Sequence, residues 1–116
     1  MIKNRLIYVA HPYAGKEANK YSIDTIMENL VMLDKNNTYL SPLHNFSMLY
    51  FDTQYAKGLK ICLDMLNRCD ALVLCGDWET SKGCIGEWSF AIAKGMPIYT
   101  WKEWTDKLKE QGDNSR

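Results

Sequence analysis

Apolar residues along this 116-residue chain follow two kinds of pattern. Short, nearly continuous apolar runs stand at residues 6–10 and 71–75, and such runs are typical of strands buried on both faces of a parallel sheet. Longer segments between these runs carry apolar residues at the period of an amphipathic helix. The pattern therefore predicts strands that alternate with helices.

The bounds of the predicted elements follow from these periods and from turn residues. Strands are expected at residues 6–10, 38–40 and 71–75, with a fourth beginning at residue 97. Helices are expected at residues 17–34, 55–68 and 84–94, followed by a last helix beyond residue 100. Gly95 is suited to end the third helix, and Thr100 with Glu103 matches a capping box for the last one. The segment 43–53, rich in Met, Phe and Tyr, is not assigned.

This alternation predicts an α/β fold, a single doubly wound flavodoxin- or Rossmann-like domain with a parallel sheet of about four strands flanked by helices. We expect the strand order 2-1-3-4, a domain at residues 1–111 and a frayed tail at residues 112–116. In such a sheet, ligands bind outside the carboxyl ends of the strands where the order reverses. The loops at residues 11–16 and 76–83 should therefore face each other across one crevice, with residues 40–45 closing one side.

The composition of the chain limits the kinds of binding partner and the cellular compartment that we expect. The formal net charge is zero, so no basic surface favours nucleic acid, and no apolar run is long enough to predict a membrane span. The chain enters its first predicted strand almost at once, so we expect no signal peptide and a cytoplasmic protein. The four cysteines form no C-x-x-C pair, and we expect buried free thiols in a reducing cytosol, with no metal and no cofactor.

Ser81, Gly83 and Glu87 form the most informative group of polar positions. They follow the strand at residues 71–75 and the polar loop at residues 76–80, and they precede or open a helix. A strand, a loop and a helix N-terminus together create a site for an anion, because free backbone N–H groups and the helix dipole point at the ligand. We expect Gly83 to let a ligand approach the backbone and the helix N-terminus to favour the ionised form of Glu87.

With these motifs in place, the chain resembles the nucleoside 2-deoxyribosyltransferase-like superfamily across roughly residues 7–99. The resemblance is nearest to small members encoded by bacteria or phages, and it extends to nucleoside-monophosphate N-glycosidases such as the 5-hydroxymethyl-dUMP hydrolase group. The residues that carry it are Tyr8-Val9-Ala10-His11-Pro12-Tyr13-Ala14-Gly15, Asn19, Ser41-Pro42-Leu43-His44, Cys69-Asp70-Ala71-Leu72-Val73-Leu74, Ser81-x-Gly83-x-x-x-Glu87, Ala91 and Gly95-Met96-Pro97-Ile98.

This resemblance implies cleavage or exchange of the bond between a base and C1′ of a ribose or deoxyribose. In such enzymes the glutamate at the position of Glu87 is the nucleophile. The residues at Ser81 and Gly83 help hold a 5′-phosphate in monophosphate-specific members. A carboxylate beside C1′ suits this chemistry because positive charge develops on the sugar.

The chain departs from the family pattern at the second acid. Many relatives carry an aspartate where this chain has Cys62, and Asp64 would lie on a different side of the helix. Candidate replacements that protonate the departing base are Asp77, Glu79, Asp52 and His11. His11 also replaces a glycine that is common in the family, which adds a side chain near the expected base or sugar.

Further residues are candidates for substrate contact because they follow predicted strands. They are His11, Tyr13, Asp77, Trp78, His44 and Asn45. Each has an alternative structural interpretation. Ser81 is also a suitable N-cap, Trp78 is suited either to stack on a base or to pack against another subunit, and Tyr8 on its buried strand is interpreted as core more readily than as contact.

Three functional hypotheses remain open at this point. The first is an N-glycosidase or deoxyribosyl transferase acting on a nucleoside or its 5′-monophosphate. The second is a non-catalytic nucleotide-binding module that senses or sequesters its ligand, which Cys62 favours. The third, a flavodoxin-like or receiver-like signalling domain, lacks the hydroxyl-rich or acidic loop it would need after the first strand. Family analogy and the segment 48–51 also predict a homo-oligomer.

Overall fold

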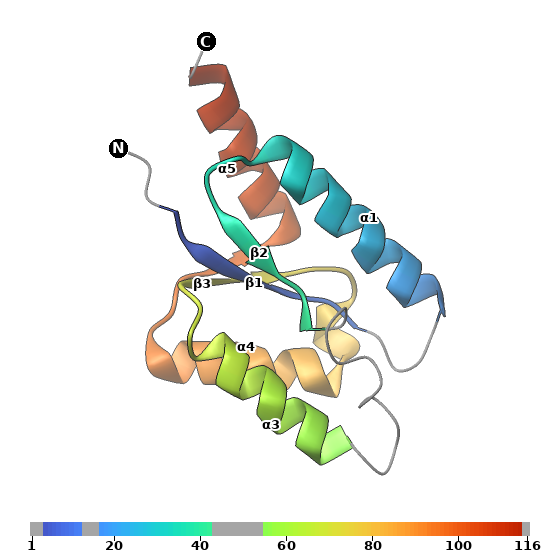
Figure 1. Cartoon of the computed structure of the whole chain (residues 1–116). Helices are drawn as coiled ribbons and strands as arrows, with labels where there is room; N and C mark the ends of the chain where they lie inside the picture. The colour runs from blue at the N-terminus through green and yellow to red at the C-terminus, as the bar shows by residue number, and fades with distance from the viewer. Residues whose placement is uncertain (1–3, 13–16, 43–54, 115–116) are drawn as a thin grey trace.

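The computed structural model describes residues 4–12, 17–42 and 55–114, and strands alternate with helices along them (Figure 1). The elements are β1 (Leu6–Ala10), α1 (Glu17–Leu33), β2 (Thr38–Leu40), α3 (Tyr55–Leu66), β3 (Ala71–Leu74), the 3-10 helix η3 (Trp78–Thr80), α4 (Lys82–Lys94), β4 (Ile98–Thr100) and α5 (Trp101–Asn114). None of the described helices is long and apolar enough to cross a membrane.

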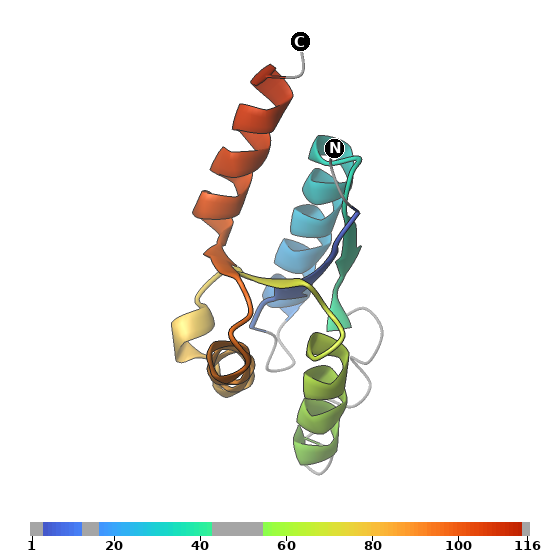
Figure 2. The same ribbon diagram turned by 90° about the vertical axis from the view of Figure 1, so that its left-hand side faces the viewer.

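The described strands form a four-stranded sheet in the order β2-β1-β3-β4, and each neighbouring pair is parallel. Tyr8 on β1 is aligned with Leu40 on β2 and with Leu72 on β3. Helices α1 and α5 cover one face of the sheet, while α3 and α4 cover the other, as the edge-on view in Figure 2 shows. The predicted α/β class and the order 2-1-3-4 are both confirmed.

Alternation along β1 divides the core between these two faces, because successive side chains of a strand point to opposite sides. Ile7 and Val9 belong to the cluster packed under α1 and α5, which also contains Trp104. Tyr8 and Ala10 belong to the cluster packed under α3 and α4. The central strand is therefore buried on both sides, as its continuous apolar sequence predicts.

Local capping explains where several helices begin and end. Ser81 is the N-cap of α4, which therefore begins two residues earlier than predicted. Gly95 ends the same helix with φ +79°, in the left-handed conformation expected of it. The Thr100 backbone N–H donates to the Glu103 carboxylate at 2.8 Å and the Glu103 N–H donates to the Thr100 hydroxyl at 3.2 Å, so the predicted capping box is confirmed.

Several bounds differ from the sequence prediction: α1 ends one residue earlier, β3 ends one residue earlier and β4 begins one residue later than expected. Helix α3 ends at Leu66 rather than residue 68, because the Cys69 N–H donates to the Leu66 carbonyl in a turn. Helix α5 continues to Asn114 and so includes the first part of the predicted tail. The loop after β3 contains the short helix η3, which the sequence pattern did not indicate.

Candidate active site

Glu87 is a buried carboxylate on the inner face of α4. Its side chain is only 5% exposed. Cys84 and Ala91, which lie one turn before and one turn after it, are the other buried residues of this helix, as expected for positions three and four apart. The sequence of α4 thus directs Glu87 toward the sheet rather than toward the solvent.

The partner of Glu87 is Tyr8 on the central strand β1. The Tyr8 hydroxyl donates a hydrogen bond to the Glu87 carboxylate, and the Tyr8 side chain is fully buried. Tyr8 was not among the predicted site residues. The signal that identifies it is the alternation of β1, which places residue 8 on the sheet face covered by α3 and α4.

Burial controls the protonation of Glu87. Removal from water disfavours the charged form and raises the pKa of Glu87 from its ordinary 4.5 to about 7, although the hydrogen bond from Tyr8 acts in the opposite direction. The expectation that the helix N-terminus keeps this group ionised is therefore wrong. The dipole acts mainly within the first turn of a helix, and Glu87 lies beyond that turn.

The N-terminus of α4 presents two backbone N–H groups for an anion. The Ser81 hydroxyl accepts from the Cys84 N–H at 3.2 Å, so Ser81 caps its own helix. The N–H groups of Lys82 and Gly83, the first two positions of α4, have no hydrogen-bond partner among the described residues. Gly83 adds no side chain that would cover them.

His11 joins three segments at the carboxyl end of the sheet. Its Nδ1 lies 2.7 Å from the Pro12 carbonyl, which only accepts, so Nδ1 carries a proton. Its Nε2 lies 3.0 Å from the hydroxyl of Ser22 on α1. The ring also lies against Gly76 after β3, where an added Cβ atom would meet the His11 Nε2 at 2.9 Å.

The loop between β3 and α4 contributes Asp77 and Trp78. Asp77 is exposed, and its carbonyl accepts the Thr80 hydroxyl at 2.8 Å. Trp78 packs against Trp88 of α4, with ring centroids 5.9 Å apart and an interplanar angle of 43°. This contact covers part of the Trp78 ring, which the sequence analysis interpreted as suited to stack on a base or to pack against another subunit.

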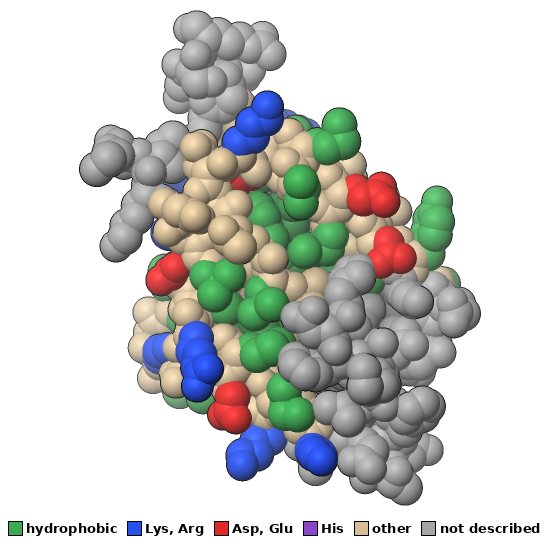
Figure 3. Space-filling view, in the orientation of Figure 1, with side chains coloured by type: hydrophobic (Ala, Val, Ile, Leu, Met, Phe, Trp, Pro, Cys, Tyr) green, Lys and Arg blue, Asp and Glu red, His purple; other side chains and the backbone are tan. Residues whose placement is uncertain are grey.

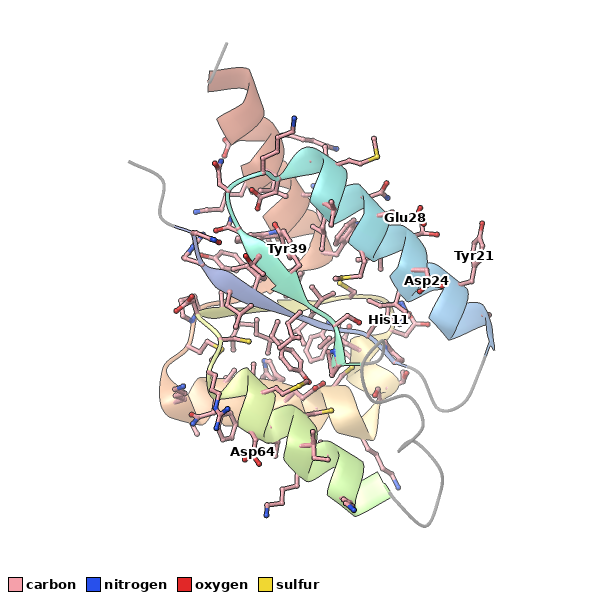
Figure 4. All side chains as sticks on the ribbon, in the orientation of Figure 1. His11, Tyr21, Asp24, Glu28, Tyr39 and Asp64 are labelled. Carbon is pink, nitrogen blue, oxygen red and sulfur yellow. The ribbon has the colours of Figure 1, made fainter. Side chains whose placement is uncertain are left out.

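The remaining predicted site residues lie outside the described residues, whereas the two residues at the departure from the family pattern are described. Tyr13, His44, Asn45 and the alternative acid Asp52 lie outside the described residues, as does the segment 48–51. Cys62 on α3 is described and belongs to the same buried cluster as Tyr8. Asp64 is exposed and projects from the side of α3 that faces away from the sheet (Figure 4).

The cysteines behave as the sequence predicts. Cys62, Cys69, Cys75 and Cys84 are all free and buried. Burial raises the pKa of the Cys84 thiol to about 12. Because the thiolate is the reactive form, this thiol is inert at neutral pH. The structure thus joins Glu87 to Tyr8 by a hydrogen bond, while Ser81 caps the helix that carries Glu87 and His11 follows the strand that carries Tyr8.

Comparisons with known proteins show which family and which solved structures this chain is similar to. A family model described as "Domain of unknown function (DUF4406)" matches residues 5–100. No curated protein matches the chain.

Two solved structures share the fold. A conserved protein from Enterococcus faecalis V583 aligns with a TM-score of 0.65 at 22% identity, over 84% of this chain and 62% of that one. A 2-deoxyribosyltransferase from the psychrotolerant bacterium Bacillus psychrosaccharolyticus aligns with a TM-score of 0.62 at 20% identity, over 82% of this chain and 70% of that one. The resemblance seen in the sequence is thus confirmed as a shared fold, and the chain spans less than two thirds of the Enterococcus protein.

Replacing the buried carboxyl should change the dependence of stability on pH. The native pKa of Glu87 is about 7 and its ordinary value is 4.5, so the native state retains a proton that the unfolded state loses as pH rises between these values. Stability therefore falls across this window. The measured quantity is the difference in unfolding free energy between wild type and Glu87→Gln. Denaturant titrations should show that this difference falls by about 3 kcal/mol from about pH 4 to about pH 8. A constant difference would contradict the raised pKa.

Gly76 offers a test of the contact with His11. Both Gly76 (φ +61°) and Gly95 (φ +79°) have left-handed backbones, but an added Cβ meets His11 only at Gly76 and nothing within 4 Å at Gly95. Gly76→Ala should therefore destabilise the protein by about 1 kcal/mol more than Gly95→Ala, measured by chemical denaturation. The excess should disappear in a His11→Ala background. An excess that survives there would assign the cost to something other than the His11 ring.

Proposed function

We propose that this chain, which belongs to the family described as Domain of unknown function (DUF4406), cleaves or exchanges the N-glycosidic bond of a nucleoside or nucleoside 5′-monophosphate. The observation that carries the proposal is the buried Glu87 carboxylate, held by the Tyr8 hydroxyl behind the N-terminus of α4. The shared fold with a protein named as a 2-deoxyribosyltransferase supports it.

Glu87 is the nucleophile in this proposal. Its ionised carboxylate attacks C1′ of the sugar and forms a glycosyl ester. The C1′–N bond breaks at the same time, the electron pair of that bond goes to the base nitrogen, and this nitrogen is protonated. Water then attacks C1′ of the glycosyl ester in hydrolysis, or a second base does so in transfer, and Glu87 is released. Low solvent exposure strengthens the interaction of the carboxylate with the positive charge that develops on the sugar.

Tyr8 orients this nucleophile. A hydrogen bond from the Tyr8 hydroxyl fixes one carboxylate oxygen and stabilises the ionised form against the effect of burial. His11 follows the carboxyl end of β1 and is the one histidine among the described residues, and its Ser22 contact holds the ring in place. We assign His11 to contact with the base, and with it protonation of the departing nitrogen.

The phosphate of a monophosphate substrate would bind at the α4 N-terminus. The N–H groups of Lys82 and Gly83 point out of the first turn and have no described partner, and this is the end of a helix that favours negative charge. Ser81 supports the site by capping the helix. We place the reaction in a reducing cytosol because all four cysteines are free.

A second candidate is a nucleotide-binding module without turnover. The observation that favours it is Cys62, a buried thiol at the position where many relatives carry an acid. In this case the same site would bind the ligand, but the leaving base would not be protonated. Calorimetry with the same nucleotides distinguishes binding without turnover from catalysis.

The catalytic proposal predicts release of free base. Incubation with a panel of nucleosides and their 5′-monophosphates, followed by NMR, should show base release from at least one member. Glu87→Gln should lower kcat by about a thousandfold or more, because the nucleophile acts mainly in the transition state. Glu110→Gln, an exposed glutamate on α5, is the matched control and should retain full activity. No base release by wild type, or equal release by Glu87→Gln, would refute the proposal.

The raised pKa also predicts a pH profile. Since the nucleophile must be ionised, kcat/KM should rise with pH and level off above about 7, the pKa of Glu87. Tyr8→Phe removes a hydrogen bond to the charged form, so the pKa rises further and the rising limb should move about one pH unit higher. If Tyr8→Phe lowers activity without moving the limb, Tyr8 does not act on the ionisation of Glu87.

A further inference from the structure

His11 has a hydrogen-bond partner at each of its two ring nitrogens. Its Nδ1–H donates to the Pro12 carbonyl at 2.7 Å, so in the neutral ring Nε2 carries the lone pair. The Ser22 hydroxyl, 3.0 Å from Nε2, therefore donates to the neutral ring and accepts from the ring once Nε2 is protonated. While these two bonds hold, neither ring nitrogen is free to donate directly to a substrate.

Gly76 packs against the Nε2 edge of the same ring. A Cβ atom added to Gly76 would lie 2.9 Å from Nε2, 3.2 Å from Cε1 and 3.3 Å from Cδ2 of His11. The backbone that follows β3 thus stands beside the nitrogen that would deliver a proton. Little room is left next to Nε2 for a substrate atom in addition to the Ser22 oxygen.

The pair of His11 and Ser22 lies where a ligand is expected in this sheet. His11 follows β1 and Gly76 follows β3. The order of the sheet, β2-β1-β3-β4, reverses between β1 and β3, and ligands bind outside the carboxyl ends of the strands at such a point. His11 and Ser22 are each only partly buried, so the hydroxyl can still contact a ligand.

Acidic side chains stand on the outer surface of α1. Figure 3 shows them on the ridge that α1 forms, and Figure 4 shows Glu28 projecting away from the sheet. Among the described residues of α1, Ser22 is the one bonded to the His11 ring. The group that continues the hydrogen-bond chain from the ring is therefore a hydroxyl, which can accept one proton and donate another.

Given the proposed cleavage of the N-glycosidic bond, on which this step rests, we propose that Ser22 delivers to the departing base a proton that His11 supplies. The Nε2–H proton of the imidazolium passes to the Ser22 oxygen. The Ser22 hydroxyl proton passes to the base nitrogen, which has taken the electron pair of the broken C1′–N bond. This Ser22 relay leaves His11 neutral. His11 regains its proton when water or a second base attacks the glycosyl ester, because either one releases a proton as it bonds to C1′.

The two faces of the sheet place the nucleophile and the relay on different sides. Glu87 comes from α4 on one face, whereas Ser22 comes from α1 on the other (Figure 2). A nucleophile that displaces the base approaches C1′ from the side opposite to the C1′–N bond, so the group that protonates the base stands across the sugar from it. A sugar held at the end of the sheet between these helices meets this requirement.

Substrates with different leaving groups test the Ser22 relay. Ser22→Ala should lower kcat for base release about a hundredfold, and Ser22→Thr, which keeps a hydroxyl, should retain most of the activity. The 4-nitrophenyl glycoside of the same sugar loses a stable anion that needs no proton, so Ser22→Ala should match wild type there within about twofold. Thr25→Ala is the matched control and should leave both rates unchanged, because the exposed Thr25 hydroxyl bonds the Tyr21 carbonyl of its own helix at 3.1 Å.

Failure of the relay and failure of the proposed function give different results. Equal losses with both leaving groups, or unchanged base release by Ser22→Ala, would show that Ser22 passes no proton, while Glu87 would keep its role. If wild type releases neither leaving group, or if Glu87→Gln releases both as fast as wild type, the proposed function fails and the relay fails with it.

The hydrogen bonds of the His11 ring can be measured without turnover. Nitrogen-15 NMR of the full chain should show the neutral ring protonated at Nδ1, with its signals assigned by their loss in His11→Gln. Ser22→Ala should shift the Nε2 resonance, because it removes the donor to that lone pair, whereas Thr25→Ala should not. A neutral ring protonated at Nε2, or an Nε2 resonance that Ser22→Ala leaves in place, would overturn the relay.

Discussion

The hydrogen bond between Tyr8 and Glu87 is the interaction on which the proposed chemistry of this molecule depends. Removing a carboxylate from water is costly unless a partner satisfies it, and the Tyr8 hydroxyl supplies that partner from the central strand. Both side chains are held by regular structure, β1 on one side and α4 on the other. The carboxyl is thus fixed in position while its pKa remains near 7, where ionisation is accessible.

The two faces of the sheet are built differently around this constraint. Under α1 and α5, Trp104 and large aliphatic residues fill the space, and the Trp104 indole donates to the Tyr39 hydroxyl at 2.9 Å. Under α3 and α4, Tyr8 belongs to a cluster that mixes small residues such as Ala10 and Ala91 with large ones such as Leu72. The buried Glu87 carboxyl lies on this side and is bonded to Tyr8. The face under α3 and α4 therefore contains a buried polar pair in addition to its apolar packing.

The parts of this structure that sequence alone predicted are those that depend on local pattern. The strand order followed from the apolar runs of β1 and β3 and from the alternation of elements, and the caps at Ser81, Gly95 and Thr100 depend on neighbouring residues only. What could not be predicted depends on contacts distant in sequence. The strand period gives the face on which Tyr8 lies, but not that its hydroxyl meets a residue 79 positions away. The sequence likewise could not predict that the pKa of Glu87 is raised, because that shift is caused by the burial of its side chain.

Hydrogen bonds hold α1 at both of its ends. Near its N-terminal end the Ser22 hydroxyl contacts His11 at 3.0 Å, and after its C-terminal end Asp34 binds the turn that leads into β2. The Ser22 contact means that the position of the His11 ring depends on α1 as well as on the end of β1. The candidate site on one side of the sheet is therefore built partly from a helix whose apolar side chains pack on the other side.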